Sequence, residues 1–206
     1  LASQYHRWVR DVSEKEDPAF YDHRTSTSTL TCLARLPRSN EEDLMRELEA
    51  FGVDAQKFVV SEVYSPPRVT KLAAKYGFVP GTAFDLTTCS EDGKYWDFDK
   101  EERRDQAFQN IRKEQPILII GSPMCTAFSL LQNLNKGKVD PRKLKDNWEK
   151  AMMHLRFCLQ IYQYQLDHGK YFLHEHPATA TSWRTHEMIT FMGQPGVERI
   201  VSDMCM

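Results

Sequence analysis

The spacing of hydrophobic residues along the chain changes near residue 57. The first 40 residues have little periodicity, and a polar run at 25–29 is typical of a linker. One helix is predicted over about 41–51, because Ser39 or Asn40 can cap its start and Gly52 follows its end. Residues 1–56 are therefore interpreted as an N-terminal extension with one helix.

From residue 57 onward, short β-rich runs alternate with segments of helical spacing. Strands are predicted over 58–64, 81–86, 117–120, 170–174 and 196–203, and helices over 69–76, 99–114, 144–168 and 183–191. The run at 117–120 is apolar at every position, which is typical of a strand covered on both faces in a parallel sheet. The alternation predicts an α/β domain over 57–206, with a doubly wound, mostly parallel sheet and helices on both faces.

Composition narrows the function classes only in part. The chain has 206 residues and a formal net charge of -2, which neither indicates nor excludes a nucleic-acid partner. It has no run of 18 apolar residues, so no membrane partner is predicted. Its five scattered cysteines include no Cys-x-x-Cys pair, which indicates an intracellular, reducing compartment, with nucleus and cytoplasm both open.

The two ends of the sequence suggest a segment of a longer protein. The chain begins at Leu1 rather than at a methionine, and it stops at Met206 directly after a predicted strand. We therefore expect further domains of a longer polypeptide, and a sheet domain that is truncated at its C-terminal end.

Polar and reactive side chains follow four of the predicted strands. In sheets of this kind, ligands bind beyond the carboxyl ends of the strands, so these clusters are expected to converge on one edge. The four clusters are Tyr64-Ser65-Pro66-Pro67-Arg68, Asp85, the segment from Gly121 to Ser129, and Glu175-His176-Pro177.

Two of these clusters resemble motifs of the cytosine-C5 methyltransferases. Met124-Cys125-Thr126-Ala127-Phe128-Ser129 is similar to the Pro-Cys-Gln-x-Phe-Ser loop, and Glu175-His176-Pro177 is similar to the Glu-Asn-Val or Glu-Asn-Pro loop. The resemblance covers roughly residues 57–206. It implies a Rossmann-like fold, S-adenosylmethionine as cofactor, and cytosine in nucleic acid as substrate, with DNA favoured over RNA. The chain also resembles divergent methyltransferase-like segments of mobile-element polyproteins.

The resemblance assigns a role to each candidate residue. Cys125 corresponds to the nucleophile that attacks cytosine C6, Glu175 to the acid that donates a proton to N3, and Ser129 to a support of the catalytic loop. A target base would have to leave its duplex to reach such a site. The residues implied to bind the cofactor are Tyr64, Ser65, Asp85, Asp97 and Pro123.

One departure from the family pattern keeps a second function open. The family's first motif is Phe-x-Gly-x-Gly, whereas this chain has Pro66 and Pro67, which lack backbone donors and stiffen the loop. This difference favours a catalytically degenerate module for nucleic-acid or protein interaction within a larger polyprotein. The retained Cys125 and Glu175 favour the enzyme.

Each candidate also has a structural interpretation. Cys125 can be a buried small hydrophobe, Glu175 an exposed acid, and Asp85 and Asp97 turn or cap residues. Basic residues at 142, 143, 145 and 150 can line a nucleic-acid channel or form a solvated face.

A zinc-dependent hydrolase or deaminase is the third interpretation. His174 and His176, two apart on a strand, can join Cys125 or His186 as zinc ligands. Because no second paired ligand motif is present, no metal is predicted.

Overall fold

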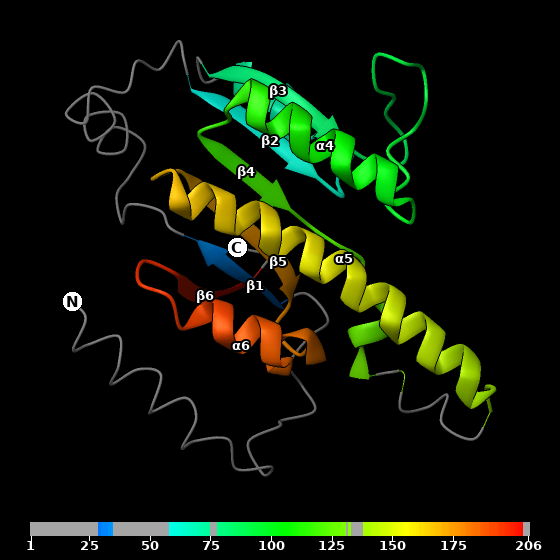
Figure 1. The fold of residues 1–206 in the computed structure, drawn as a ribbon. Helices are drawn as coiled ribbons and strands as arrows, with labels where there is room; N and C mark the ends of the chain where they lie inside the picture. Colours follow the sequence, from blue (N-terminus) through cyan, green and yellow to red (C-terminus); the bar gives the residue numbers. More distant parts are fainter. Residues whose placement is uncertain (1–28, 35–57, 75–77, 131, 133–137, 204–206) are drawn as a thin grey trace.

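The computed structural model describes residues 29–34, 58–74, 78–130, 132 and 138–203. In this part of the chain, six strands form one sheet in the order β3-β2-β4-β5-β1-β6 (Figure 1). They are β1 (Thr29–Ala34), β2 (Val59–Val63), β3 (Val79–Phe84), β4 (Leu118–Gly121), β5 (Tyr171–Pro177) and β6 (Glu198–Asp203). The strands β3, β2, β4 and β5 are parallel, whereas β1 is antiparallel to both β5 and β6. The helix predicted over about 41–51 lies outside the described residues.

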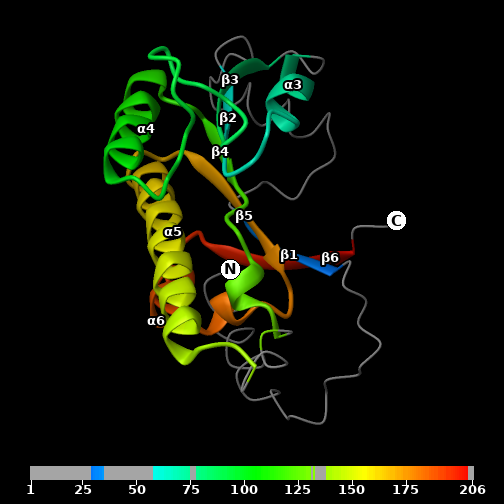
Figure 2. The same cartoon turned by 90° about the vertical axis from the view of Figure 1, so that its right-hand side faces the viewer.

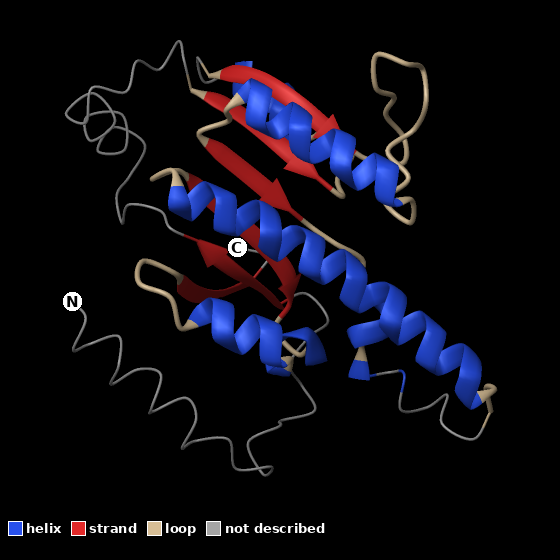
Figure 3. Ribbon diagram, in the orientation of Figure 1, coloured by secondary structure: helices blue, strands red, loops and turns tan. Residues whose placement is uncertain are grey.

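Helices flank the parallel strands on both faces. Three helices, α4 (Glu101–Glu114), α5 (Pro141–Asp167) and α6 (His186–Met192), lie on one face, and the short α3 (Val69–Ala73) lies on the other (Figure 2). Two short 3-10 helices, η4 (Thr126–Phe128) and η6 (Thr181–Arg184), follow β4 and β5. Helices and strands alternate through the parallel part of the fold (Figure 3), which confirms the predicted α/β class with a parallel sheet flanked by helices.

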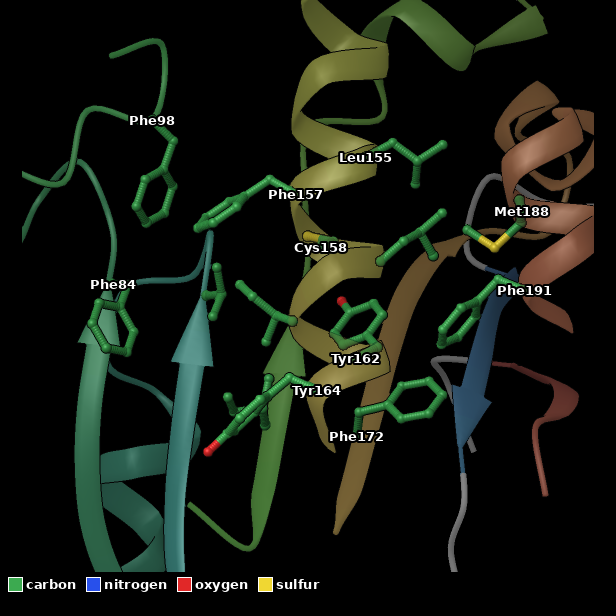
Figure 4. Packing of buried hydrophobic residues seen from close by; sticks show 14 of the residues in the cluster. Phe84, Phe98, Leu155, Phe157, Cys158, Tyr162, Tyr164, Phe172, Met188 and Phe191 are labelled. Atoms are coloured by element: carbon green, nitrogen blue, oxygen red, sulfur yellow. The ribbon is translucent and has the colours of Figure 1, made fainter. Parts of the chain in front are cut away.

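The main core lies between the sheet and α5. Leu155 and Tyr162 of α5 are fully buried in one cluster with Ile119 of β4 and Phe172 of β5. Figure 4 shows Tyr162 of α5 beside Phe172. The rings of Tyr162 and Phe172 are stacked, with centroids 4.7 Å apart. Tyr162 lies so close to Gly121 that a Cβ at this position would be 2.9 Å from the ring carbon Cζ and closer still to the hydroxyl oxygen. The close packing of α5 on β4 therefore requires glycine at position 121.

A second, smaller core lies on the α3 face. Phe58, Val60 and Ala73 are buried there, and Leu118 and Ile120 of β4 pack against them. Because Ile119 faces the main core while its two neighbours face this one, apolar side chains of β4 cover both faces of the sheet, as the run at 117–120 predicted.

Two features of the sheet differ from the sequence prediction. Strand β1 comes from the segment interpreted as an extension, yet it lies inside the sheet between β5 and β6. Its pairing also lengthens β5, because Cys32 is the partner of Glu175 and Leu30 the partner of Pro177. Glu175 was expected in a loop after the strand, and this expectation was wrong: it lies within β5. In the described part of the chain, no helix is long and apolar enough to cross a membrane.

Candidate functional site

The strand register aligns the four predicted clusters at one edge of the sheet. Val63 pairs with Phe84 on one side and with Gly121 on the other, and Gly121 pairs with His174. The next residues along the four strands, in sheet order, are Asp85, Tyr64, Ser122 and Glu175. Neighbouring strands are about 4.8 Å apart, so Asp85 and Glu175 lie roughly 14 Å apart across this edge.

The edge includes a topological switch point between β2 and β4. The chain leaves β2 for β3 on one side and then crosses to β4 on the other, and ligands of open α/β sheets bind outside such a crossing. Tyr64 turns the chain there with φ 63°, a left-handed conformation that is uncommon for a tyrosine. Its N–H donates to the Phe84 carbonyl at 2.9 Å, and the Ser122 N–H donates to the Val63 carbonyl at 3.1 Å. The turn is therefore held from both sides.

The side chain of Tyr64 points toward α5 and ends in a chain of polar contacts. Its hydroxyl is 2.8 Å from Nδ1 of His154, and His154 Nε2 is 3.0 Å from Oδ1 of Asp99. Burial lowers the pKa of His154, which favours the neutral ring. The neutral ring donates a hydrogen bond from Nε2 to Asp99 and accepts one at Nδ1 from the Tyr64 hydroxyl. Burial also raises the pKa of Tyr64, which stays protonated. Lys150 completes the chain at 2.5 Å from Oδ2 of Asp99.

A buried acid satisfies the backbone of the loop after β2. Glu62 is fully buried, and its carboxylate accepts the N–H groups of Arg68 at 3.2 Å and Thr70 at 2.6 Å. Pro66 and Pro67 have no N–H to offer. The loop thus presents fewer backbone donors than a glycine-rich loop would. Sequence reasoning missed Glu62, although an acid inside a hydrophobic strand is itself an informative signal.

Asp85 and Asp97 both stabilise turns, as their structural interpretation expected. Asp85 Oδ1 accepts the Thr87 N–H at 2.9 Å and its hydroxyl at 2.7 Å, while Oδ2 has no hydrogen-bond partner among the described residues. Asp97 accepts the Asp99 N–H at 3.2 Å and pairs with Lys100 at 3.3 Å. Asp85 is half-buried at the site edge, and only one of its two carboxylate oxygens is committed to the turn.

The loop after β4 is anchored to β5 beneath Cys125. His176 Nε2 donates to the carbonyl of the buried Pro123 at 2.9 Å, and its Nδ1 accepts the Ser182 hydroxyl at 2.7 Å. Burial lowers the pKa of His176 to about 4, so its ring is neutral near pH 7 and this donor–acceptor arrangement is stable. Cys125 itself is half-buried, forms no disulfide, and precedes η4, where its carbonyl accepts the Phe128 N–H at 2.9 Å. Sequence reasoning gave His176 no role in holding this loop.

Glu175 and Cys125 approach the same loop from different directions. Burial alternates along β5: His174 contacts Tyr162 of α5, and His176 lies on the same buried face, so Glu175 points to the opposite face. Its Oε2 accepts the Ser122 hydroxyl at 3.0 Å. The structure therefore joins Glu175 to the base of the Cys125 loop, and no hydrogen bond links Glu175 to the thiol.

A groove opens beside Cys125, between η4 and the first half of α5. Its volume is about 590 Å³, and both neighbours of Cys125, Met124 and Thr126, line it. Ser129, which follows η4, lines it as well, and its N–H donates to the Thr126 carbonyl at 3.3 Å. The predicted support residue is thus part of the groove wall.

The zinc interpretation lacks a donor set. His174 and His176 share one buried face, with ring centroids 4.7 Å apart, but both nitrogens of His176 are already hydrogen-bonded. His174 Nδ1 lies 3.1 Å from the Tyr162 hydroxyl, and its buried Nε2 has no partner. Among the residues with described positions, no group of three histidine, cysteine or acidic side chains is placed to hold a metal ion.

Comparisons with protein-family models, with curated proteins and with solved structures found no match for this chain.

Proposed function

We propose that this chain is an S-adenosylmethionine-dependent methyltransferase of Rossmann-like fold that acts on cytosine C5 in nucleic acid. The main support is the arrangement at the sheet edge. Cys125 lies on an anchored loop after β4, and Glu175 of the adjacent strand holds the base of that loop through Ser122. Asp85 lies at the same edge, beyond the switch point.

The residue types suit attack on an aromatic ring that is otherwise unreactive at C5. The Cys125 thiol loses its proton to water, the thiolate attacks cytosine C6, and a carbon–sulfur bond forms as the C5–C6 double bond opens. The Glu175 carboxyl donates its proton to N3, which prevents negative charge from accumulating on the ring. S-adenosylmethionine would supply an electrophilic methyl group for C5 and leave as S-adenosylhomocysteine. Loss of the C5 proton to water or hydroxide then expels the sulfur and restores the double bond, and the N3 proton returns to Glu175.

The two ends of the cofactor make different demands on the site. A carboxylate at the end of the second parallel strand suits ribose hydroxyls, and the uncommitted Oδ2 of Asp85 fits that role. A methionine carboxylate needs N–H donors, for which Ser65 is placed at the switch point before the two prolines. Ser65 and Asp85 would therefore hold the cofactor, with Tyr64 shaping the turn between them.

A non-catalytic module is the second candidate, and a specific observation favours it. Glu62 already takes the N–H groups of Arg68 and Thr70, so the loop after β2 is satisfied without a ligand. In this alternative, the same edge serves nucleic-acid or protein interaction without methyl transfer.

Covalent trapping separates the two candidates. An oligonucleotide containing 5-fluorocytosine is incubated with the chain and S-adenosylmethionine, and the product is analysed by mass spectrometry. Fluorine blocks the final elimination, so a working enzyme is expected to stay bound through Cys125. Cys125→Ser should give no adduct, and Cys158→Ser, which removes a buried thiol on α5, is the matched control. If the wild-type chain forms no adduct, the enzyme proposal fails.

Cofactor binding is measured independently of catalysis. Calorimetric titration with S-adenosylhomocysteine is expected to show binding that Asp85→Ala weakens and Asp105→Ala, an exposed acid on α4, leaves unchanged. Absence of binding would reject the cofactor and leave the interaction module as the better explanation.

A further inference from the structure

The groove between η4 and α5 has the composition of a ligand site. Its volume of about 590 Å³ falls within the range of small-molecule pockets. Three large apolar side chains line it while remaining accessible to solvent: Met124 at 51%, Trp148 at 40% and Leu130 at 38% exposure. Single exposed apolar residues are ordinary on a protein surface, but several that converge on one hollow mark a binding surface.

Trp148 is supported on one side by an aromatic contact at this groove. Its ring packs edge-to-face on Phe128, with centroids 5.2 Å apart, and Phe128 is buried against His176. A ring that is fixed on one side and exposed on the other loses little conformational freedom when a flat ligand stacks on it. Asn147 and Gln132 add amide groups to the lining. Flat aromatic rings with polar edges match this combination.

Cations on α5 narrow the class of ligand: Lys150 lines the groove, where it pairs with Asp99, and further cations flank the lining residue Leu144 in sequence. Arg142, Lys143 and Lys145 are exposed in the first two turns of α5, alongside the N-cap Asp140 and the exposed Asp146. Arg142 pairs with Asp140 and Lys145 with Glu149, but these pairs are exposed and weak. Lys143 forms no ion pair among the described residues. An aromatic surface beside cations fits a nucleobase with its phosphates better than an apolar peptide.

We propose that this groove binds an unpaired stretch of a nucleic-acid strand, with one base stacked on Trp148 and the adjoining phosphates near Arg142 and Lys143. Met124 and Thr126 line the groove on either side of Cys125, so the stacked base would neighbour the base that is presented to the thiol. This role of the groove rests on the proposed function, and it adds that the nucleic acid is bound as a single strand.

Fluorescence anisotropy with a short labelled oligodeoxycytidine tests this role. Binding is measured with the full chain and without S-adenosylmethionine, so that it does not depend on methyl transfer. Trp148→Ala is expected to weaken binding by about 5- to 150-fold, and Trp148→Phe should retain most of the affinity, because base–aromatic stacking needs a ring. Tyr95→Ala is the matched control, since Tyr95 is an exposed aromatic residue outside the groove, bridged to Cys89. Circular dichroism checks that each variant is folded.

Salt dependence gives a second readout. Lys143→Gln is expected to reduce the slope of log affinity against log salt by about 0.7 for a single strand, while Trp148→Ala leaves the slope unchanged. The inference is overturned if Trp148→Ala binds as tightly as wild type, or if the chain binds duplex DNA as tightly as the single strand. If binding depends on Trp148 but no covalent trapping occurs, the groove proposal stands and the methyltransferase proposal fails. If trapping occurs but Trp148→Ala binds as tightly as wild type, the methyltransferase proposal stands and the groove proposal fails.

Discussion

Substitution of Gly121 by alanine tests the packing that places the Cys125 loop. The new methyl group would meet Tyr162, whose ring carbon Cζ is 2.9 Å from the ideal Cβ position. Tyr162 is fully buried between α5 and the sheet and is stacked on Phe172, so the ring has little room to withdraw. Overpacking of a close-packed core costs about 1–3 kcal/mol.

The same displacement removes a buried hydrogen bond. The Tyr162 hydroxyl is 3.1 Å from Nδ1 of His174, whose other nitrogen already lacks a partner. Leaving a buried polar group unsatisfied costs about 1–3 kcal/mol. We therefore expect Gly121→Ala to lower the free energy of unfolding by about 2–6 kcal/mol in total.

Urea denaturation followed by circular dichroism measures this loss. Gly193→Ala is the matched control, because its Cβ would have ordinary contacts, the nearest at 3.5 Å to the Thr190 carbonyl. A double variant combines Gly121→Ala with Tyr162→Phe, which removes the hydroxyl that the new methyl group meets. Its loss of unfolding free energy should be smaller than the sum of the two single losses by about 1 kcal/mol or more. A Gly121→Ala variant within about 0.5 kcal/mol of wild type would refute the packing argument.

Three further changes have expected outcomes in the same denaturation assay. Leu155→Ala, in the fully buried core, should lower the free energy of unfolding by about 2–5 kcal/mol, and a loss below about 1 kcal/mol would contradict its place there. Glu62→Ala should lower the free energy of unfolding by about 1–3 kcal/mol, because two backbone donors lose their acceptor. The control Glu101→Ala, at an exposed residue, should have little effect. Equal losses would argue against the role of the Glu62 carboxylate as this acceptor. Burial holds the pKa of His176 at about 4, so as pH falls below about 6.5 the unfolded chain takes up the proton first, and stability is lost from there down to about pH 4. His176→Gln should reduce that loss, and an unchanged pH profile would exclude His176 as a source.

Local signals were sufficient for most of the parallel sheet. The run at 117–120, most of which becomes β4, is apolar at each position, and the buried residues of the long helix α5 recur at helical spacing. Both patterns depend on neighbours in sequence, which is why they could be recognised without a structure. The alignment of Tyr64, Asp85 and Ser122 at one edge followed from the rule that parallel strands share their carboxyl ends.

The missed features depend on contacts between distant segments. Strand β1 becomes a strand because β5 and β6 flank it, and nothing within its own short sequence specifies those partners. Glu175 lies inside β5 for the same reason. The hydrogen bonds from backbone N–H groups to Glu62 and the Tyr64–His154 contact likewise join residues whose relation appears only after the chain has folded.

The position of β1 in the sheet has a consequence for the order of folding. Both of its neighbours, β5 and β6, are made near the other end of the described chain, so during synthesis β1 must wait for almost all of the intervening residues. The parallel strands β2, β3 and β4 can assemble earlier, because their partners follow at short separations. Late closure of β1 between two distant strands raises the contact order of the domain, and we expect it to be the slow step in refolding.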